Sequence, residues 1–321
     1  MRKRSLLLAA GACLATLTLA VGSAVADPTG APTFRALAGG GADGPENLMN
    51  ELSNIITVNG TKVIGSYNVS GSAQITTKAP PANCTINRPG NGGAGIAALV
   101  TSQTNGDGCL QFARQVTNDS ASRPGTNLTY IPYASDALSF VIRDDSPLTR
   151  SLTVADLFKI YDCDPEFAGI NPLLGSFGAG TRRLFLTSIG HTDTSNFTTL
   201  NPCVTDGVPE NRGIQLTQPG HIAPHSVAQF QSQKNGVTPD STGRTILGSI
   251  NGISATVVNN SSTIPREIFT VVPNSLVGTQ PTNTVFVGSG SQVCQNSATI
   301  QKYGFGTHPN CGSTSIQTPP N

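Results

Sequence analysis

Apolar and polar residues follow one another along the chain in blocks that predict strands and helices in turn. Residues 33–38 form an apolar-rich run typical of a strand, and the glycine-rich stretch 39–44 follows directly. From Pro45 to about Ile56 the apolar side chains recur at helical spacing, at Leu48, Met49, Leu52, Ile55 and Ile56. A strand, a glycine turn and a helix in this order make one unit of an α/β fold.

The same alternation continues through the first half of the chain. A second strand is predicted at 61–67, and the loop 68–73 follows it. The glycine-containing stretch 88–93 precedes a short helical run at 94–102, and a compact segment follows at 109–114. These blocks extend the pattern of strands and helices.

The middle of the chain is predicted to be extended and then helical. Residues 127–143 indicate a long extended stretch with turn chemistry in its middle. Residues 152–161 form a short helix with Thr153 as its N-cap. A further glycine turn at 178–182 opens a helix that continues to Leu186.

The remaining blocks complete an α/β pattern. Within 220–234 a helix is predicted to begin at His225 or Ser226. Two strand-like runs, 245–258 and 267–272, precede a tail rich in glycine and cysteine. Strands that alternate with helices predict an α/β fold with a largely parallel or mixed sheet.

The first 26 residues have the layout of a secretory signal peptide. A basic head, Met1 to Arg4, precedes an apolar run that ends near Val21, and Ala24-Val25-Ala26 forms a small-x-small cleavage site. We therefore expect cleavage after Ala26 and a secreted protein. An alternative is lipid anchoring at Cys13, because Ala10-Gly11-Ala12-Cys13 resembles a weak lipoprotein box.

Cysteines and charge narrow the class of protein further. Six of the seven cysteines follow the leader, and an even number in an oxidising compartment predicts disulfides. Among the open connectivities we favour pairing of sequence neighbours, which gives Cys84 with Cys109, Cys163 with Cys203 and Cys294 with Cys311. Without the basic head, 16 basic residues face 18 acidic ones, a net charge near −2. A basic stripe for nucleic acid is missing, and so are zinc-type cysteine spacings and a Gly-x-Ser-x-Gly elbow.

Three glycine-rich turns are the candidate binding elements: 39–44, 70–73 and 178–182. The first backbone N–H groups of a helix have no partner within the helix, and the helix dipole places partial positive charge there. Glycine allows a ligand to approach that backbone closely. Three such turns flanked by Ser, Thr or Asp favour binding of an anion.

The order of these segments resembles the phosphate-binding branch of the periplasmic solute-binding protein family. The turn 39–44, the loop Ser70-Gly71-Ser72-Ala73 and the segment Phe112-Ala113-Arg114 are similar to its binding loops. Two stretches are more specific. LTVADLFKIYDC at 152–163 resembles the family's Leu-Thr-x-x-x-Leu-x-x-Ile-Tyr helix, and Ala179-Gly180-Thr181-Arg182 resembles its Ser-Gly-Thr-Arg helix start.

The resemblance implies two α/β lobes with mixed sheets and a ligand cleft between them. Lobe I would comprise 27–133 and 255–321, and lobe II 134–254. Ser72 would donate to the anion from the second loop, Thr181 and the Gly180 N–H from the helix start, and Arg182 or Arg114 would supply positive charge. Asp43 either caps its own helix or accepts a proton from the anion. The candidate ligand-binding residues are Gly41, Ala42, Asp43, Ser70, Gly71, Ser72, Arg114, Asp136, Gly180, Thr181 and Arg182.

The chain also departs from the family pattern. Ala179 stands where a serine is usual, Leu174-Gly175-Ser176 lacks the usual arginine, and residues 114–116 lack the usual aspartate. A cation in place of that acid favours a fully ionised or carboxylate-bearing ligand. We expect a monomeric binding protein without catalysis, cofactor or metal, with an ABC permease as a candidate partner. The alternative is an extracellular structural or interaction protein that keeps the fold without a ligand.

Overall fold

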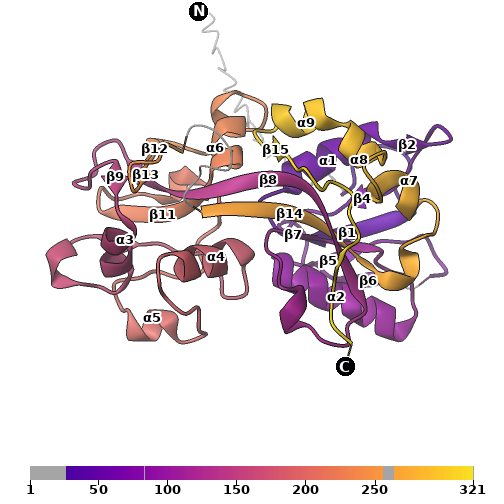
Figure 1. Ribbon diagram of the computed structural model, residues 1–321, viewed down its shortest axis with the longest axis horizontal. Helices are drawn as coiled ribbons and strands as arrows, with labels where there is room; N and C mark the ends of the chain where they lie inside the picture. Colours follow the sequence, from indigo (N-terminus) through magenta and orange to yellow (C-terminus); the bar gives the residue numbers. More distant parts are fainter. Residues whose placement is uncertain (1–26, 83, 256–263, 321) are drawn as a thin grey trace, which may run out of the picture.

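Two long antiparallel strands cross the molecule and join its two lobes (Figure 1). The structure, a computed structural model, describes residues 27–82, 84–255 and 264–320. The predicted signal peptide, its cleavage site and Cys13 lie outside these residues. The crossing strands are β8 (Leu128–Arg143) and β14 (Ile264–Pro273), which pair from Leu128 opposite Pro273 to Leu138 opposite Ile264.

The turn predicted in the middle of residues 127–143 is wrong, because β8 is continuous through it. Nearly every residue of β8 is buried, since elements cover both of its faces. The register with β14 shifts between Ile268 and Phe269, beside Pro132. A bulge at that point accommodates a residue that has no N–H to donate to a neighbouring strand.

Lobe I is built on three parallel strands next to β14. Strand β1 (Leu37–Gly41) lies between β4 (Ile64–Ser66) and β7 (Phe112–Gln115). Helix α1 (Glu46–Ile55) covers one face of the sheet and α2 (Gly92–Asn105) the other (Figure 1). The predicted helices at 45–56 and 94–102 are therefore present, although α2 is longer at both ends.

Two strand predictions in lobe I need correction. Strand β1 begins later than 33–38 and includes the first glycines of 39–44. A Cβ at Gly39 would lie 2.3 Å from the carbonyl oxygen of Phe112, so glycine permits the close approach of β7. The predicted strand 61–67 is divided, because 61–62 belong to the small hairpin of β2 (Thr57–Val58) and β3 (Thr61–Lys62). Strands β5 (Gln74–Thr76) and β6 (Thr85–Asn87) form another hairpin.

Lobe II continues the same sheet beyond β8. Strand β11 (His221–Ser226) and β12 (Thr245–Leu247) pair with β8, and β10 (Asn171–Pro172) pairs with β11. The predicted strand 245–258 is interrupted after Leu247, because Ser249–Ile250 form β13 and pair with β9 (Ser151–Leu152). Residues 256–258 of that prediction lie outside the described residues.

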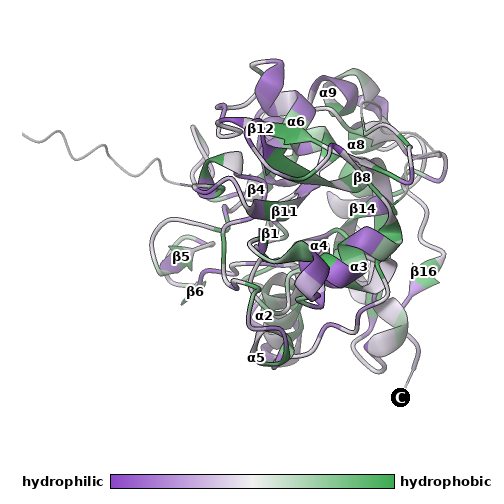
Figure 2. Cartoon of the chain, turned by 90° about the vertical axis from the view of Figure 1, so that its left-hand side faces the viewer, coloured by the Kyte–Doolittle hydropathy of each residue, from purple (hydrophilic) through white to green (hydrophobic). Residues whose placement is uncertain are grey.

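Helices cover both faces of the lobe II sheet (Figures 1 and 2). Helices α3 (Val154–Tyr161), α4 (Gly180–Ser188) and α5 (Phe197–Leu200) bury the larger core, and α6 (Val227–Lys234) lies on the other side. Thr153 caps α3 through a capping box with Asp156, as predicted. Ser226 caps α6, so the predicted helix start is confirmed.

The C-terminal tail returns to lobe I and packs against its hydrophobic core. It forms α7 (Thr282–Phe286), α8 (Gln292–Gln295) and α9 (Ser297–Lys302), and then β15 (Gly306–Thr307) and β16 (Ile316–Gln317), which pair with β8. Short 3-10 turns occur at Ser120–Ser122, Pro165–Phe167, Gly213–Gln215 and Asn274–Leu276. Of the proposed lobe boundaries, 133/134 falls within β8, and 254/255 lies beside residues outside the described part.

All three predicted disulfides are confirmed: Cys84–Cys109, Cys163–Cys203 and Cys294–Cys311. The first and third disulfides lie within lobe I, and the second joins the end of α3 to the loop after α5 in lobe II. Within 27–82, 84–255 and 264–320, every helix is too short or too polar to cross a membrane.

Candidate functional site

Three helix N-termini meet at one cavity of about 240 Å³ between the lobes. Lobe I contributes the turn before α1, the loop at Val69 and Ser70, and the start of α2. Lobe II contributes the start of α4 and the loop 207–212. The predicted turns at 39–44, 70–73 and 178–182 therefore all reach the same place, although they are far apart in the sequence.

The lobe I wall consists mostly of backbone. It includes Ala42, Asp43 and Gly44 at the end of β1, and Gly90, Asn91 and Gly92 where α2 begins. Asn91 is the N-cap of α2, and its side chain accepts a hydrogen bond from the Ala94 N–H at 2.8 Å. Because parallel strands end on the same side of the sheet, the turns that follow them gather at one edge.

The lobe II wall combines a helix start with a loop. Gly180 and Thr181 begin α4, and a Cβ at Gly180 would lie 2.7 Å from Val116, so glycine lets this helix approach lobe I. The loop presents Glu210 and Arg212 to the cavity. Asn211 ties the loop across the cleft, because its Nδ2 donates to Asp43 at 2.9 Å and its Oδ1 accepts from the Ser226 N–H at 3.0 Å.

Two carboxyl groups face the cavity, and both have an elevated pKa. Burial is the main cause of the raised pKa of Asp43, against the hydrogen bond from Asn211 and the charges of Arg212, Arg114 and Arg266. Burial and, to a smaller extent, the charge of the nearby Asp43 raise the pKa of Glu210 to about 7. Glu210 can therefore hold a proton near neutral pH.

The capping interpretation of Asp43 is wrong. Helix α1 begins at Glu46 after Pro45, and no side chain caps it. The carboxylate of Asp43 instead accepts from Asn211 of the opposite lobe. Of the two interpretations of this residue, only a role toward a guest in the cleft stays open.

The arginines expected to hold an anion are occupied by protein groups. Arg114 donates to the Ala42 carbonyl and the Ser66 hydroxyl and lies 3.3 Å from Glu46. Arg182 pairs with Asp193 at 2.8 Å and Asp206 at 2.5 Å. Both are fully buried and lie behind the cavity lining rather than in it.

The remaining candidates divide between the cavity and its surroundings. Five candidates line the cavity: Ala42, Asp43, Ser70, Gly180 and Thr181. The other six, all among the described residues, lie outside the lining: Gly41, Gly71, Ser72, Arg114, Asp136 and Arg182. Ser72, expected to donate to an anion, instead donates to the Gln74 carbonyl and accepts from Arg88 at 2.9 Å.

Asp136 supports the site from behind. It lies opposite Arg266 in the β8–β14 ladder and accepts hydrogen bonds from that guanidinium at 2.5 and 2.8 Å. It also accepts from the Ser226 hydroxyl at 2.6 Å. Arg266 in turn donates from Nη1 to the Thr181 hydroxyl at 2.9 Å. The pair therefore connects the crossing strands to the start of α4.

Several lining residues were not among the candidates, and those with the clearest chemistry are Asn91, Gly92, Glu210 and Arg212. The stretch before α2 was visible as Asn-Gly-Gly ahead of a helical run, which is a helix-start pattern. Glu210 and Arg212 lie in a loop without a local motif. Arg212 is exposed, and among the described residues it has no carboxylate within ion-pair distance.

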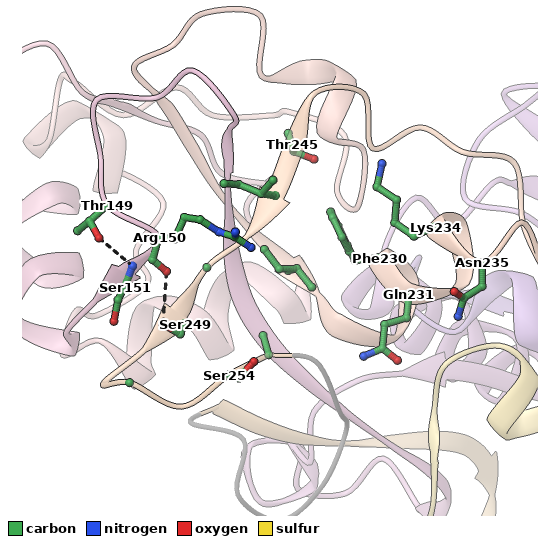
Figure 3. A pocket seen from close by; sticks show the side chains of 15 residues that line it. Thr149, Arg150, Ser151, Phe230, Gln231, Lys234, Asn235, Thr245, Ser249 and Ser254 are labelled. Carbon is green, nitrogen blue, oxygen red and sulfur yellow. Dashed lines mark hydrogen bonds between the residues drawn. The ribbon is translucent and has the colours of Figure 1, made fainter.

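Two larger cavities also occur among the described residues, and one of about 970 Å³ is lined by Val116, Asp136 and Arg266. Figure 3 shows a pocket of about 690 Å³ on lobe II, where Arg150 lies near β13 and Phe230 and Lys234 project from α6. Its described lining includes none of the candidate residues. Among residues 27–82, 84–255 and 264–320, no three His, Cys, Asp or Glu side chains gather as metal ligands.

Comparison with solved structures identifies the fold. A substrate-binding protein with bound phosphate from Clostridium perfringens is 15% identical, with a TM-score of 0.55 over 85% of this chain and 99% of that one. An ABC-type phosphate transport receptor from Vibrio cholerae is 14% identical, with a TM-score of 0.51 over 85% and 100%. A phosphate-binding protein from Stenotrophomonas maltophilia is 14% identical, with a TM-score of 0.50 over 86% and 91%.

These likenesses show that the chain has the two-lobed fold of phosphate-binding proteins, as the motifs predicted. Neither a protein-family model nor a curated protein sequence matches the chain.

Proposed function

We propose that this chain is a secreted solute-binding protein that holds a small oxyanion of the phosphate class between its lobes. The observation that supports this most is the meeting of three helix N-termini, from both lobes, at one cavity. Unpartnered N–H groups and aligned helix dipoles favour negative charge at such a point. The shared fold adds support, because the similar solved structures include proteins with bound phosphate.

The size and donors of the cavity fit a small ion. A volume of about 240 Å³ lies below the range of drug-sized pockets, which begins at about 300 Å³. Backbone N–H groups at the starts of α2 and α4, the Ser70 hydroxyl and the Arg212 guanidinium would be the donors. Arg212 takes the role that the sequence assigned to Arg114 or Arg182.

Entry of a guest would require the lobes to part. The described structure bridges the cleft through Asn211 to Asp43, through the Gln229 side chain to the Gly44 carbonyl, and through Arg183 to Thr117 at 2.7 Å. Strands β8 and β14 are the only continuous crossing ladder of the described residues, so they would act as the hinge.

A second candidate is an extracellular interaction protein that keeps the fold without a ligand. Two carboxyl groups line the cavity, and Arg114 and Arg182 are each paired with a carboxylate of the protein. Both observations favour this alternative, because they leave less positive charge for an anion. The three disulfides agree with an oxidising, extracellular compartment for either candidate. An ABC permease as partner, and release after Ala26, belong to the first proposal.

Ligand-dependent melting separates the two candidates. Phosphate, sulfate or a small organic anion at about one hundred times its dissociation constant should stabilise a binding protein by about 2.7 kcal/mol. Arg212→Ala should weaken anion affinity about tenfold to a hundredfold, because a hydrogen bond to a charged group contributes about 1.5–3 kcal/mol. Native mass spectrometry and calorimetry would measure both effects.

The matched control is Arg150→Ala, which removes an exposed cation from the separate pocket of lobe II. It changes the net charge equally and should leave anion affinity unchanged. Equal losses in both variants would show that the anion responds to overall charge and not to this cavity. Absence of binding by all three proteins would favour the interaction protein.

A further inference from the structure

Glu210 lies where an anion would be expected to bind. Its carboxyl group lines the cavity together with Thr181, and the Thr181 side chain and the Arg182 backbone N–H, two donors at the first turn of α4, both act to lower its pKa. These are donors of the kind that an oxyanion takes at a helix N-terminus. A side chain of the protein therefore already satisfies the anion-binding end of this helix.

The carboxylate is packed deeply for a residue of a surface loop. Glu210 as a whole is half-buried, yet its Oε1 is shielded from solvent and has no hydrogen-bond partner among the described residues. A Cβ at Gly175 would lie 2.5 Å from that atom, so the side chain reaches the backbone of the neighbouring turn. An unpaired buried carboxylate oxygen is unfavourable, and its removal to water would recover that loss.

We propose that Glu210 is a built-in competitor whose carboxylate occupies the oxyanion position at the start of α4, so that a guest binds by displacing it. This inference rests on the proposed oxyanion-binding function. Arg266 donates a hydrogen bond to the Thr181 hydroxyl oxygen, which fixes the orientation of this side chain. The hydroxyl proton remains available, so Thr181 can donate it either to Glu210 or to the guest. The same donors then serve Glu210 before the guest arrives and the oxyanion afterwards.

Displacement of Glu210 also reaches the opposite lobe. The next residue, Asn211, bonds to Asp43 of lobe I, and its carbonyl accepts from Gln233 at 2.9 Å. A movement of Glu210 out of the cavity pulls on the Asn211–Asp43 bridge. Release of the competitor and parting of the lobes are therefore mechanically linked.

The exchange should release a proton to solvent. In its buried position Glu210 has a pKa of about 7, and displacement into water returns that pKa toward its ordinary value of 4.5. Burial keeps His225 neutral, because it lowers the pKa of that residue to about 4. The charged and titratable groups around Glu210 are Asp43, Arg266, Arg212, Arg182, Asp206 and His225. Of these only Asp43 is a second carboxyl group with a raised pKa, and it stays in every variant below.

The test is calorimetric titration of the full mature chain with sulfate and with phosphate across about pH 5 to 9. Sulfate keeps its charge over this range, so a pH effect on its affinity belongs to the protein. Wild type should lose affinity by up to about tenfold per pH unit below about pH 7, and it should release protons on binding. Glu210→Gln and Glu210→Ala should bind about tenfold more tightly than wild type at about pH 6 and show a smaller pH slope.

Glu166→Gln is the matched control, because it removes an exposed carboxylate of the same lobe whose one ion pair within the described part of the chain is with Lys159. It should retain the wild-type pH slope. Weaker binding by both Glu210 variants at every pH would overturn the competitor and make Glu210 a contact to the guest. An unchanged slope in those variants would also overturn it. If wild type and all variants fail to bind either ion, the proposed function falls together with this inference.

Discussion

The two walls of the cavity differ in what they present to it. The lobe I wall is made of turns that end parallel strands and open helices, and it contributes backbone groups with few side chains. The lobe II wall contains one helix start and the loop 207–212, which contributes a carboxylate and a guanidinium. Lobe I therefore supplies mainly backbone groups and one carboxyl group, Asp43, while lobe II supplies both a carboxylate and a guanidinium.

The walls also differ in how they are held. Lobe I turns are fixed by the sheet itself, as the hydrogen bond from Ala42 N–H to the Arg114 carbonyl at 3.0 Å shows. Thr181 of lobe II depends on a side-chain relay from Asp136 through Arg266. A wall held by a side-chain relay should be more sensitive to a single substitution than a wall held by a strand ladder.

The largest expected effect comes from breaking the relay behind the lobe II wall. Asp136→Ala should destabilise the protein by about 3–5 kcal/mol, because it leaves the Arg266 guanidinium buried without its carboxylate. It should also weaken anion binding, since Arg266, which donates to Thr181, loses the carboxylate that holds it in place. Urea denaturation and calorimetry would measure the two losses.

The control for this substitution is Asp144→Asn, which weakens an exposed pair with Arg244. Exposed pairs contribute about 0–1 kcal/mol, so stability should hardly change. If Asp136→Ala were as mild as this control, the relay would not support the wall and the contrast between the lobes would fail.

A smaller effect should appear in the pH dependence of stability. The folded state holds the pKa of Glu210 at about 7, above its ordinary value of 4.5, so folding favours the protonated form. This contribution is fully present below about pH 4.5 and is lost as the pH rises through about 7. Glu210→Gln cannot ionise, and it should gain about 1–3 kcal/mol relative to wild type between about pH 5 and 8.

Thermal unfolding at several pH values, without added anion, checks this change. Glu166→Gln should follow the wild-type curve, because that carboxylate is exposed. A parallel course of wild type and Glu210→Gln from acid to neutral pH would contradict a buried, proton-holding Glu210. Burial in lobe I raises the pKa of Glu46 to about 7 as well. Wild type and Glu210→Gln both retain Glu46, so both should show the change of stability with pH that this residue causes.

The contrast between the walls also explains what the sequence could predict. The lobe I turns and the start of α4 were visible because strand, glycine and helix follow one another within a few residues. Thr153 and Ser226 were predictable as N-caps for the same reason: capping uses a side chain and an N–H that are neighbours in the chain. The sequence was sufficient to predict a feature wherever the interacting groups are neighbours in the chain.

Other residues could not be assigned in this way, since their partners are distant in sequence. The pairing of Arg182 with Asp206, and of Arg114 with Glu46, depends on how the segments pack, so two arginines with the right spacing proved to be occupied. Glu210 and Arg212 carry no motif and reach the cavity only because Asn211 bonds across the cleft. Pro132 suggested a turn, yet a bulge in the crossing ladder accommodates it.

The smallest expected effect tests the lobe I wall through its one side-chain cap. Asn91→Ala removes the acceptor for the Ala94 N–H and should destabilise the protein by about 1 kcal/mol, and Thr153→Ala at the start of α3 should do the same. Only Asn91 lines the cavity, so only Asn91→Ala should also weaken anion binding, by about two- to fivefold, as the first turn of α2 frays and its dipole is less well fixed. Calorimetry at constant pH compares the two variants. Equal affinities would mean that the start of α2 contributes nothing to the guest.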